Sequence, residues 1–332
     1  MTIRIKDVAK EAGVSTATVS HVINDTKFVS DEVKLKVEEA MKRLQYIPNM
    51  VARSLRSRKS NTIGLIVPIK ANDNSNNFFI SVANGIEDVL RKNGYHLLLS
   101  NSHEDPIEEI ERIKMFNTQR IDGLIIAPTS GITRDNCSLF GNYPIVFFDR
   151  RPEGVTGDWI LVDGMKSAYN GVSALIKKGH RKIGFIAGRM DIPTSKDRFN
   201  GYRKALEDYG IGFNEEYIRI GDLNRASGYE MTKELIGQEA ITAVFVANNA
   251  MSLGAVKYLK ENHYDIPGDI ALIGFDDYEW TGIVHPPLSV IRQPSSEVGR
   301  KAAEIMLKRI KRSGSKCQGH LLEAELVVRG SF

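Results

Sequence analysis

The sequence has little cysteine and no long apolar run. Of its 332 residues only Cys137 and Cys317 are cysteines, and no CxxC pair occurs, so neither a disulfide framework nor a cysteine zinc site is expected. Apolar runs such as GLIIAP and PIVFF are far too short to span a bilayer, and the N-terminus lacks the apolar core of a signal peptide. We therefore expect a cytoplasmic protein in a reducing compartment.

Signatures of common enzyme classes are missing as well. The segment GLIVPIKAN, at the end of the first expected strand, contains no GxGxxG, which argues against a dinucleotide enzyme. No Ser/His/Asp order, metal-ligand spacing or Cys/His pair stands out, and the seven histidines are scattered. We predict a protein that is not an enzyme and uses neither a cofactor nor a metal. A sugar-modifying enzyme stays an alternative, because Asp and Asn side chains can catalyse.

The net charge of +4 is unevenly distributed. The first 60 residues carry 12 lysines and arginines against 7 acidic residues, whereas the rest of the chain carries 33 against 34. A basic module on a near-neutral body suits a polyanionic partner, although on charge alone a solvated charged face is the commoner explanation.

Spacing within that basic module predicts three helices. Apolar residues at i, i+3, i+4 and i+7 mark a first helix over residues 5–12, which Gly13 ends and which Ser15, a helix-capping residue, follows after a very short turn. We place Ala17, Val19 and Val22 on the inner face of the second helix. A third helix, about residues 31–44, adds to a small core. The second helix offers small hydrogen-bonding groups: Thr16, Thr18, Ser20, His21 and Asn24. Two short helices across a glycine turn are typical of a DNA-binding helix-turn-helix.

From residue 62 onward, short apolar runs alternate with helical stretches. TIGLIVP, YHLLLSN, DGLIIAP and PIVFFD read as buried strands, and after about Asp163 the scheme repeats in KIGFIAG, AVFVANN, IALIGFD and LSVIRQP. Such alternation predicts an α/β fold with two doubly wound parallel-sheet subdomains, and a ligand site outside the carboxyl ends of the strands.

Polar and aromatic residues gather where these strands end. Carboxylates and guanidinium groups can hold adjacent hydroxyls, and aromatic rings can cover the C–H face of a sugar, so the set suits a neutral polyhydroxy ligand. A strand-end aspartate taken alone is more often only a helix cap. The set comprises Phe78, Phe79, Asp149, Arg150, Thr194, Arg198, Asn248, Asn249 and Asp276.

The segment IKDVAKEAGVSTATVSHVIN…YIPNMVARSLRS resembles the DNA-binding headpiece of the lactose/galactose-repressor family of bacterial transcription regulators, and its VSHVIN is similar to the purine-repressor branch. The likeness covers essentially the whole chain. It implies that PNMVARSL is a hinge helix, which pairs with its copy from a second subunit in the minor groove. An apolar wedge that bends DNA onto more protein surface can offset the cost of unstacking a base step. The family's wedge corresponds to Leu55, and Arg53 and Arg56 would hold the flanking backbone, with Asn49 and Ala52 in the same DNA-binding segment.

The body is similar to periplasmic sugar-binding proteins. This likeness implies effector contacts from NNFF, DR, DRFNGY, NN and GFDD, and Gln293 lies at the family's crossover between the two halves. Ile192 stands where the purine-binding branch has an arginine, so a free sugar such as a pentose is the expected effector rather than a purine.

We accordingly expect a helix-turn-helix domain over residues 1–47, a hinge and linker over 48–60, and an effector-binding and dimerisation domain over 61–332. Together these parts predict a homodimeric repressor that binds a pseudo-palindromic double-stranded DNA operator under the control of a small molecule. No leucine heptad follows AELVVRG, which favours a dimer over a tetramer. The alternatives are a sugar-binding protein or a sugar-modifying enzyme that uses the same cleft.

Overall fold

The computed structural model describes residues 3–24, 27–46, 60–70, 77–129, 131–133, 138–238, 241–312, 314 and 316–332. The chain divides into two compact units, Met1–Ser60 and Asn61–Phe332. Within the described part of the chain, no helix is long and apolar enough to cross a membrane.

Among the described residues of the first unit there are three helices: α1 (Ile5–Ala12), α2 (Thr16–Asn24) and α3 (Asp31–Arg43). Gly13 ends α1 in the left-handed conformation, with φ at 67°, as its position predicted. The apolar stripes of the three helices meet in a small core: Val8, Ala9, Val19, Val37 and Ala40. The prediction for Ala17 was wrong. Its side chain is exposed, because Val19 and Val22 already supply the face of this short helix that meets α1 and α3.

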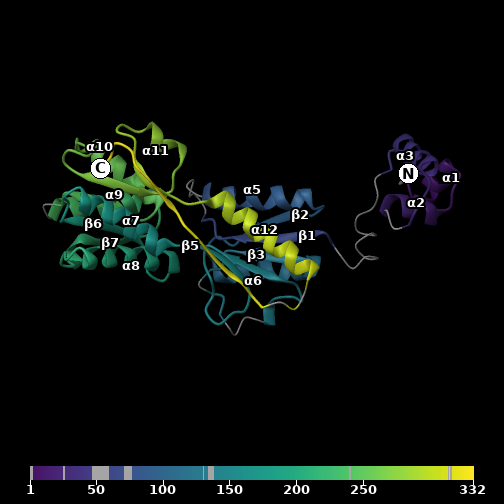
Figure 1. The fold of residues 1–332 in the computed structure, drawn as a ribbon, viewed down its shortest axis with the longest axis horizontal. Coiled ribbons are helices and arrows are strands. Elements are labelled where there is room, and N and C mark those ends of the chain that lie inside the picture. Colours follow the sequence, from purple (N-terminus) through teal and green to yellow (C-terminus); the bar gives the residue numbers. More distant parts are fainter. Residues whose placement is uncertain are drawn as a thin grey trace. The chain divides into compact units, whose positions relative to one another are not determined.

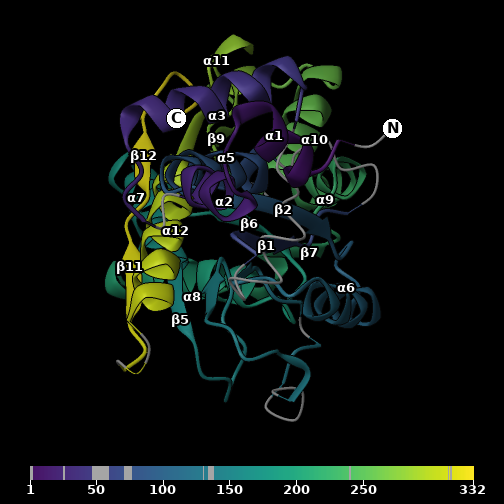
Figure 2. The same ribbon diagram turned by 90° about the vertical axis from the view of Figure 1, so that its right-hand side faces the viewer.

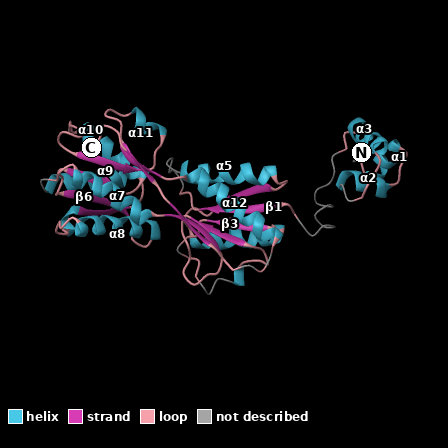
Figure 3. Cartoon of the chain, viewed as in Figure 1, coloured by secondary structure: helices cyan, strands magenta, loops and turns pink. Residues whose placement is uncertain are grey.

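The second unit contains two six-stranded sheets with the same layout (Figures 1 and 3). The first has the order β11-β5-β4-β3-β1-β2, with strands β1 (Thr62–Val67), β2 (His96–Asn101), β3 (Gly123–Ile126), β4 (Ile145–Phe148), β5 (Asp158–Val162) and β11 (Gly319–Leu322). The second has the order β12-β10-β9-β8-β6-β7, with strands β6 (Ile183–Gly188), β7 (Ile218–Gly221), β8 (Ala243–Val246), β9 (Ala271–Phe275), β10 (Ser289–Arg292) and β12 (Glu325–Val327). All neighbours pair in parallel except β10 and β12.

Helices cover both faces of each sheet, as the continuous apolar strands predicted. On the first sheet, α5 (Asn77–Lys92) and α12 (Ser295–Lys311) pack together on one face and α6 (Pro106–Gln119) lies on the other. On the second, α7 (Gly164–Lys177) pairs with α8 (Pro193–Asp208), and α9 (Arg225–Gln238) pairs with α10 (Asn249–Glu261). The described part of this unit also includes two short helices, η2 (Glu215–Tyr217) and α11 (Glu279–Ile283).

The chain crosses between the two subdomains three times: after β5, between β10 and α12, and between β11 and β12. Strands β11 and β12 therefore lie on one side of the unit, and the edge strands β2 and β7 lie on the other (Figure 2). This arrangement leaves a cleft at the carboxyl ends of the strands, where the functional residues were expected.

Candidate effector cleft and DNA-reading helix

The surface of α2 carries the predicted DNA-reading side chains. The Ser15 hydroxyl accepts a hydrogen bond from the Thr18 backbone N–H at 3.0 Å and lies 2.9 Å from the Thr18 hydroxyl, so it caps the helix as predicted. Ser15 and Thr16 are exposed, and Thr18, Ser20 and His21 are half-buried. The Asn24 side chain and the hinge residues Asn49, Ala52, Arg53, Leu55 and Arg56 lie outside the described residues.

In the second unit, two aspartates occupy equivalent positions in the two sheets. Asp149 follows β4 and Asp276 follows β9, and each strand is third from the edge in its sheet. Both residues are in the left-handed conformation, with φ of 61° and 63°. A non-glycine residue held there costs of order 1–3 kcal/mol and is often found at a ligand site. The repeated backbone turn directs both carboxylates into the cleft, where burial raises the pKa of each and nearby arginines oppose that rise.

Arg198, on α8, is attracted to both carboxylates. Its guanidinium carbon lies 3.6 Å from the ring centroid of Phe275, and one terminal nitrogen donates to the Ala247 carbonyl at 2.7 Å. Its Nε is buried and has no hydrogen-bond partner among the described residues. Burial lowers the pKa of Arg198 in spite of the two aspartates. The Nε of this arginine is therefore a buried donor left unsatisfied within the described part of the chain.

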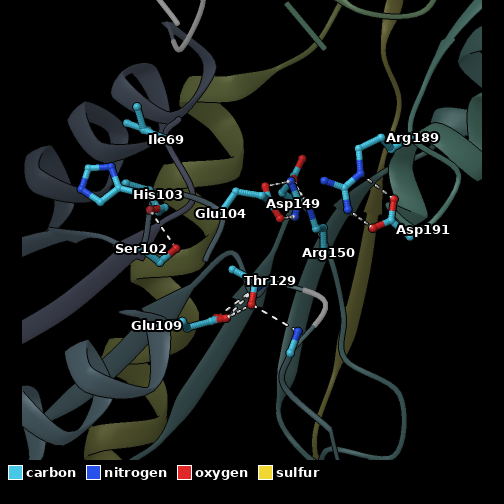
Figure 4. Close-up of polar contacts among 12 residues, drawn as sticks. Ile69, Ser102, His103, Glu104, Glu109, Thr129, Asp149, Arg150, Arg189 and Asp191 are labelled. Carbon is cyan, nitrogen blue, oxygen red and sulfur yellow. Dashed lines mark hydrogen bonds and ion pairs between the residues drawn. The ribbon is translucent and has the colours of Figure 1, made fainter. Parts of the chain in front are cut away.

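Arg150 has a different environment (Figure 4). Its two terminal nitrogens donate to the two carboxylate oxygens of Glu104 at 2.5 and 2.8 Å, and its Nε donates to Asp149 at 3.2 Å. Burial acts to lower the pKa of Arg150, but these partners outweigh it and the pKa is raised. Glu104 was not predicted. It lies three residues beyond the end of β2, so the strand-end rule that identified Asp149 could have found it.

The aromatic residues lie at the start of α5, as predicted. The rings of Phe78 and Phe79 meet edge to face, with centroids 5.3 Å apart, and the Phe78 backbone N–H donates to the Tyr278 hydroxyl at 2.9 Å. That hydrogen bond joins the two subdomains across the cleft. Tyr278 was missed, because only the assembled subdomains bring it near α5.

The remaining predicted residues differ in position. Thr194, in the first turn of α8, lines the cleft. Gln293, in the crossover after β10, donates a hydrogen bond to the Asp276 carboxylate at 2.7 Å. Asn248 also lines it and caps α10 by accepting from the Met251 N–H. Asn249 is buried behind it and is not among the lining residues, although its amide nitrogen has no partner within the described part of the chain.

Together these side chains surround a cavity of about 100 Å³ between the subdomains. Its lining combines carboxylates, guanidinium groups, amides and two phenylalanine rings. The full lining is Pro68, Lys70, Phe78, Phe79, Glu104, Asp149, Arg150, Ile192, Thr194, Ser195, Arg198, Leu223, Asn248, Asp276, Tyr278 and Gln293.

Comparison with known proteins agrees with both units. Residues 4–49 match the family described as bacterial regulatory proteins, lacI family, and residues 172–332 match the periplasmic binding protein-like domain. Transcriptional repressors named PurR are similar along their whole length. Those from Mannheimia succiniciproducens and Actinobacillus pleuropneumoniae serotype 3 are 34% and 36% identical, over 98% of this chain and 98% and 97% of theirs.

Solved structures show the same architecture. The lac repressor dimer bound to operator and the anti-inducer ONPF superposes with a TM-score of 0.89 at 28% identity, covering 100% of this chain and 99% of that one. The regulator CelR in complex with cellobiose gives 0.73 at 28% identity, covering 99% and 100%. A LacI-family regulator from Enterococcus faecium with bound ribose gives 0.70 at 27% identity, covering 81% and 98%.

A helix-turn-helix unit followed by a two-subdomain ligand-binding unit defines an effector-controlled DNA-binding transcription regulator. The chain belongs to the lacI family of bacterial regulatory proteins. The resemblance and the fold expected from the sequence are thereby confirmed. Because the relatives are repressors and not enzymes, the prediction of a regulator holds over the enzyme alternative.

Proposed function

We propose that this regulator responds to a small uncharged sugar held in the cleft. The observation that carries the proposal is the pair of aspartates on equivalent left-handed turns, both attracted to Arg198. Sugar hydroxyls can donate to both carboxylates and accept from the unpaired Nε of Arg198, and the two phenylalanines can cover an apolar ring face. We assign the effector contacts to Phe78, Phe79, Asp149, Thr194, Arg198, Asn248, Asp276 and Gln293, with Asn249 and Arg150 supporting them.

The bound ribose and cellobiose in two similar regulators support a sugar. The similarity to repressors named PurR makes a purine the alternative effector to test. Ile192, an apolar residue in the cleft wall, favours the sugar because it supplies no hydrogen bond to a base.

For DNA we propose that Thr16, Thr18 and His21 read base edges in the major groove, with Ser15, Ser20 and Asn24 nearer the phosphates. The hinge assignment rests on the family alone: Leu55 as the wedge, Arg53 and Arg56 on the backbone, and Asn49 and Ala52 beside them. The corresponding division is a DNA-binding domain over 1–47, a hinge over 48–60 and an effector domain over 61–332. A regulator that binds chromosomal DNA in a bacterium would be located in the cytoplasm.

We further propose a homodimer that pairs through the side of the second unit formed by β2 and β7. Leu99 on β2, Ile107 on α6 and Ile220 on β7 are apolar and exposed there, with 48%, 72% and 53% of their surface accessible. Apolar side chains gathered on edge strands mark an interaction surface. A two-fold pair of headpieces would read a pseudo-palindromic operator.

The sugar proposal is tested by a thermal-shift screen of free sugars, purines and sugar phosphates on the full-length protein. A ligand at 100 times its Kd should stabilise the native state by about 2.7 kcal/mol. We expect stabilisation by a free sugar, and a much smaller shift in Arg198→Met, which keeps a long apolar side chain over Phe275 but has no charge. Stabilisation by purines alone would refute the sugar assignment.

A further inference from the structure

Glu104 is held in the cleft by an unusual loop between β2 and α6. His103 and Glu104 are both in the left-handed conformation, with φ of 53° and 60°. The loop is fixed on each side. The Asn101 side chain accepts from the Ile69 N–H at 2.9 Å and donates to the Ile69 carbonyl at 2.8 Å, and Asp105 caps α6 by accepting from the Ile107 N–H at 2.7 Å. Consecutive left-handed non-glycine residues persist only where their surroundings demand them, and this pair directs the Glu104 carboxylate at Arg150 (Figure 4).

The two arginines of the cavity therefore differ in what they can offer a ligand. Glu104 and Asp149 already occupy the terminal nitrogens and the Nε of Arg150, and the side chains of Glu104 and Arg150 are only 12% and 9% exposed. A fork-to-fork pair with a carboxylate uses the same N–H edge of the guanidinium that would bind a phosphate. Arg198 has no such carboxylate partner hydrogen-bonded to it, and its Nε is unpaired among the described residues.

Formal charges in the cavity wall balance. Three cationic residues line it, Lys70, Arg150 and Arg198, and three anionic ones, Glu104, Asp149 and Asp276. Without the Glu104 carboxylate the wall would carry one net positive charge, and the two terminal nitrogens of the buried Arg150 would lose their carboxylate partner.

We propose that Glu104 is a specificity-determining residue: by holding both terminal nitrogens of Arg150 in a bidentate pair it makes the cleft select uncharged ligands and exclude their phosphate esters. This inference deepens the proposed sugar function and rests on it for the identity of the ligand. A phosphate that reached Arg150 would have to displace Glu104 and leave that carboxylate buried without a partner, which is strongly unfavourable. Removing the charge of Glu104 removes that barrier and exposes a ready anion site.

The test uses isothermal titration of the full-length protein with three probes: D-ribose, D-ribose 5-phosphate and inorganic phosphate. Glu104→Gln is nearly isosteric and removes the charge. The double variant Glu104→Gln/Arg150→Gln removes the anion site as well, and it also corrects for phosphate bound by the basic headpiece. Glu108→Gln is the matched control, because it breaks a Glu–Arg pair with Arg112 one turn further along, outside the cavity lining.

We expect Glu104→Gln to bind D-ribose 5-phosphate or inorganic phosphate about 10- to 100-fold more tightly than the wild type, the gain typical of a charge-assisted hydrogen bond. Glu108→Gln and the double variant should show no gain. If Glu104→Gln does not fold, Glu104→Asp replaces it. Its carboxylate is one methylene too short to keep both hydrogen bonds, so a smaller gain in the same direction is expected.

Two results would overturn the inference: unchanged phosphate affinity in a folded Glu104 variant, or a gain that persists when Arg150 is also replaced. Failure of the sugar proposal is visible separately. Ribose and the other free sugars would then bind no variant, while the phosphate arm would still report on Glu104 and Arg150.

Discussion

Replacement of Glu109 by glutamine should change the pH dependence of stability by an amount that the structure defines. Glu109, on α6, has no exposed surface, and the Thr129 backbone N–H donates to its two carboxylate oxygens at 2.8 and 3.1 Å. Burial, the largest effect, raises its pKa from 4.5 to about 7, while the hydrogen bonds from Thr129 oppose that rise. Glutamine fits the same space, since its oxygen can accept from that N–H and its amide can donate to the Thr129 hydroxyl.

The sign follows from proton linkage. A carboxyl whose pKa is raised on folding binds its proton more tightly in the native state, so its contribution to stability is complete below the unfolded pKa and is lost as pH rises through the folded pKa. Between 4.5 and about 7, at 1.36 kcal/mol per pKa unit, that loss is about 3 kcal/mol. Glu109→Gln cannot ionise, so its stability relative to the wild type should rise by about 3 kcal/mol between pH 4.5 and pH 8.

Urea unfolding at pH 4.5, 6, 7 and 8 measures this difference. Unfolding is followed by tryptophan fluorescence in a Trp280→Phe background, which leaves Trp159 as the single tryptophan. Trp159 packs in the same apolar cluster as α6 and therefore reports on unfolding of the subdomain built on the first sheet. Glu111→Gln, on the exposed side of α6, is the matched control for loss of one carboxylate, and its curve should parallel that of the wild type. Parallel curves for Glu109→Gln and wild type would refute the reasoning.

Three further predictions concern DNA and assembly. His21→Ala should lose about 1–3 kcal/mol of discrimination between operator and scrambled DNA; equal weakening on both would show that His21 does not read sequence. Leu55→Ala should reduce operator bending in a gel-phasing assay while nonspecific affinity, which phosphate contacts dominate, changes little; unaltered bending would remove the wedge assignment. Leu99→Arg, which puts a charge on the apolar face at β2, should shift the protein toward monomer in analytical ultracentrifugation, and an undisturbed dimer would place the interface elsewhere.

Most of the fold could be predicted because its central strands are continuous apolar runs. All eight expected strands are present, from β1 to β10. The four that were missed do not show that pattern. Strand β5 begins with the buried Asp158, which pairs with Arg309, and β7, β11 and β12 are short edge strands with partly exposed residues. The prediction that β2 is buried was wrong: β2 is an edge strand with partly exposed residues, and it was found only because its HLLL run is itself apolar.

The cleft residues that could be predicted from the sequence are those that follow the ends of strands. Asp149, Arg198 and Asp276 were identified in this way. Glu104 was missed although it lies three residues beyond the end of β2, within reach of the same rule. Tyr278 was missed because only contact between the subdomains brings it near α5, and such a contact has no local signal in the residue pattern.

The central claim is that a ligand in this cleft controls DNA binding, and one measurement tests it directly. Fluorescence anisotropy would follow binding of the full-length protein to a DNA fragment selected from random sequence, with and without a saturating free sugar, in wild type and Asp276→Asn. Asparagine keeps the shape of the side chain and can still accept from Gln293, but removes the charge that we propose holds sugar hydroxyls. We predict that sugar changes the DNA affinity of the wild type at least about fivefold, the lower end of typical allosteric coupling, and that Asp276→Asn binds DNA normally without this response. A wild-type affinity that no free sugar changes, or an Asp276→Asn response equal to that of the wild type, would contradict the account.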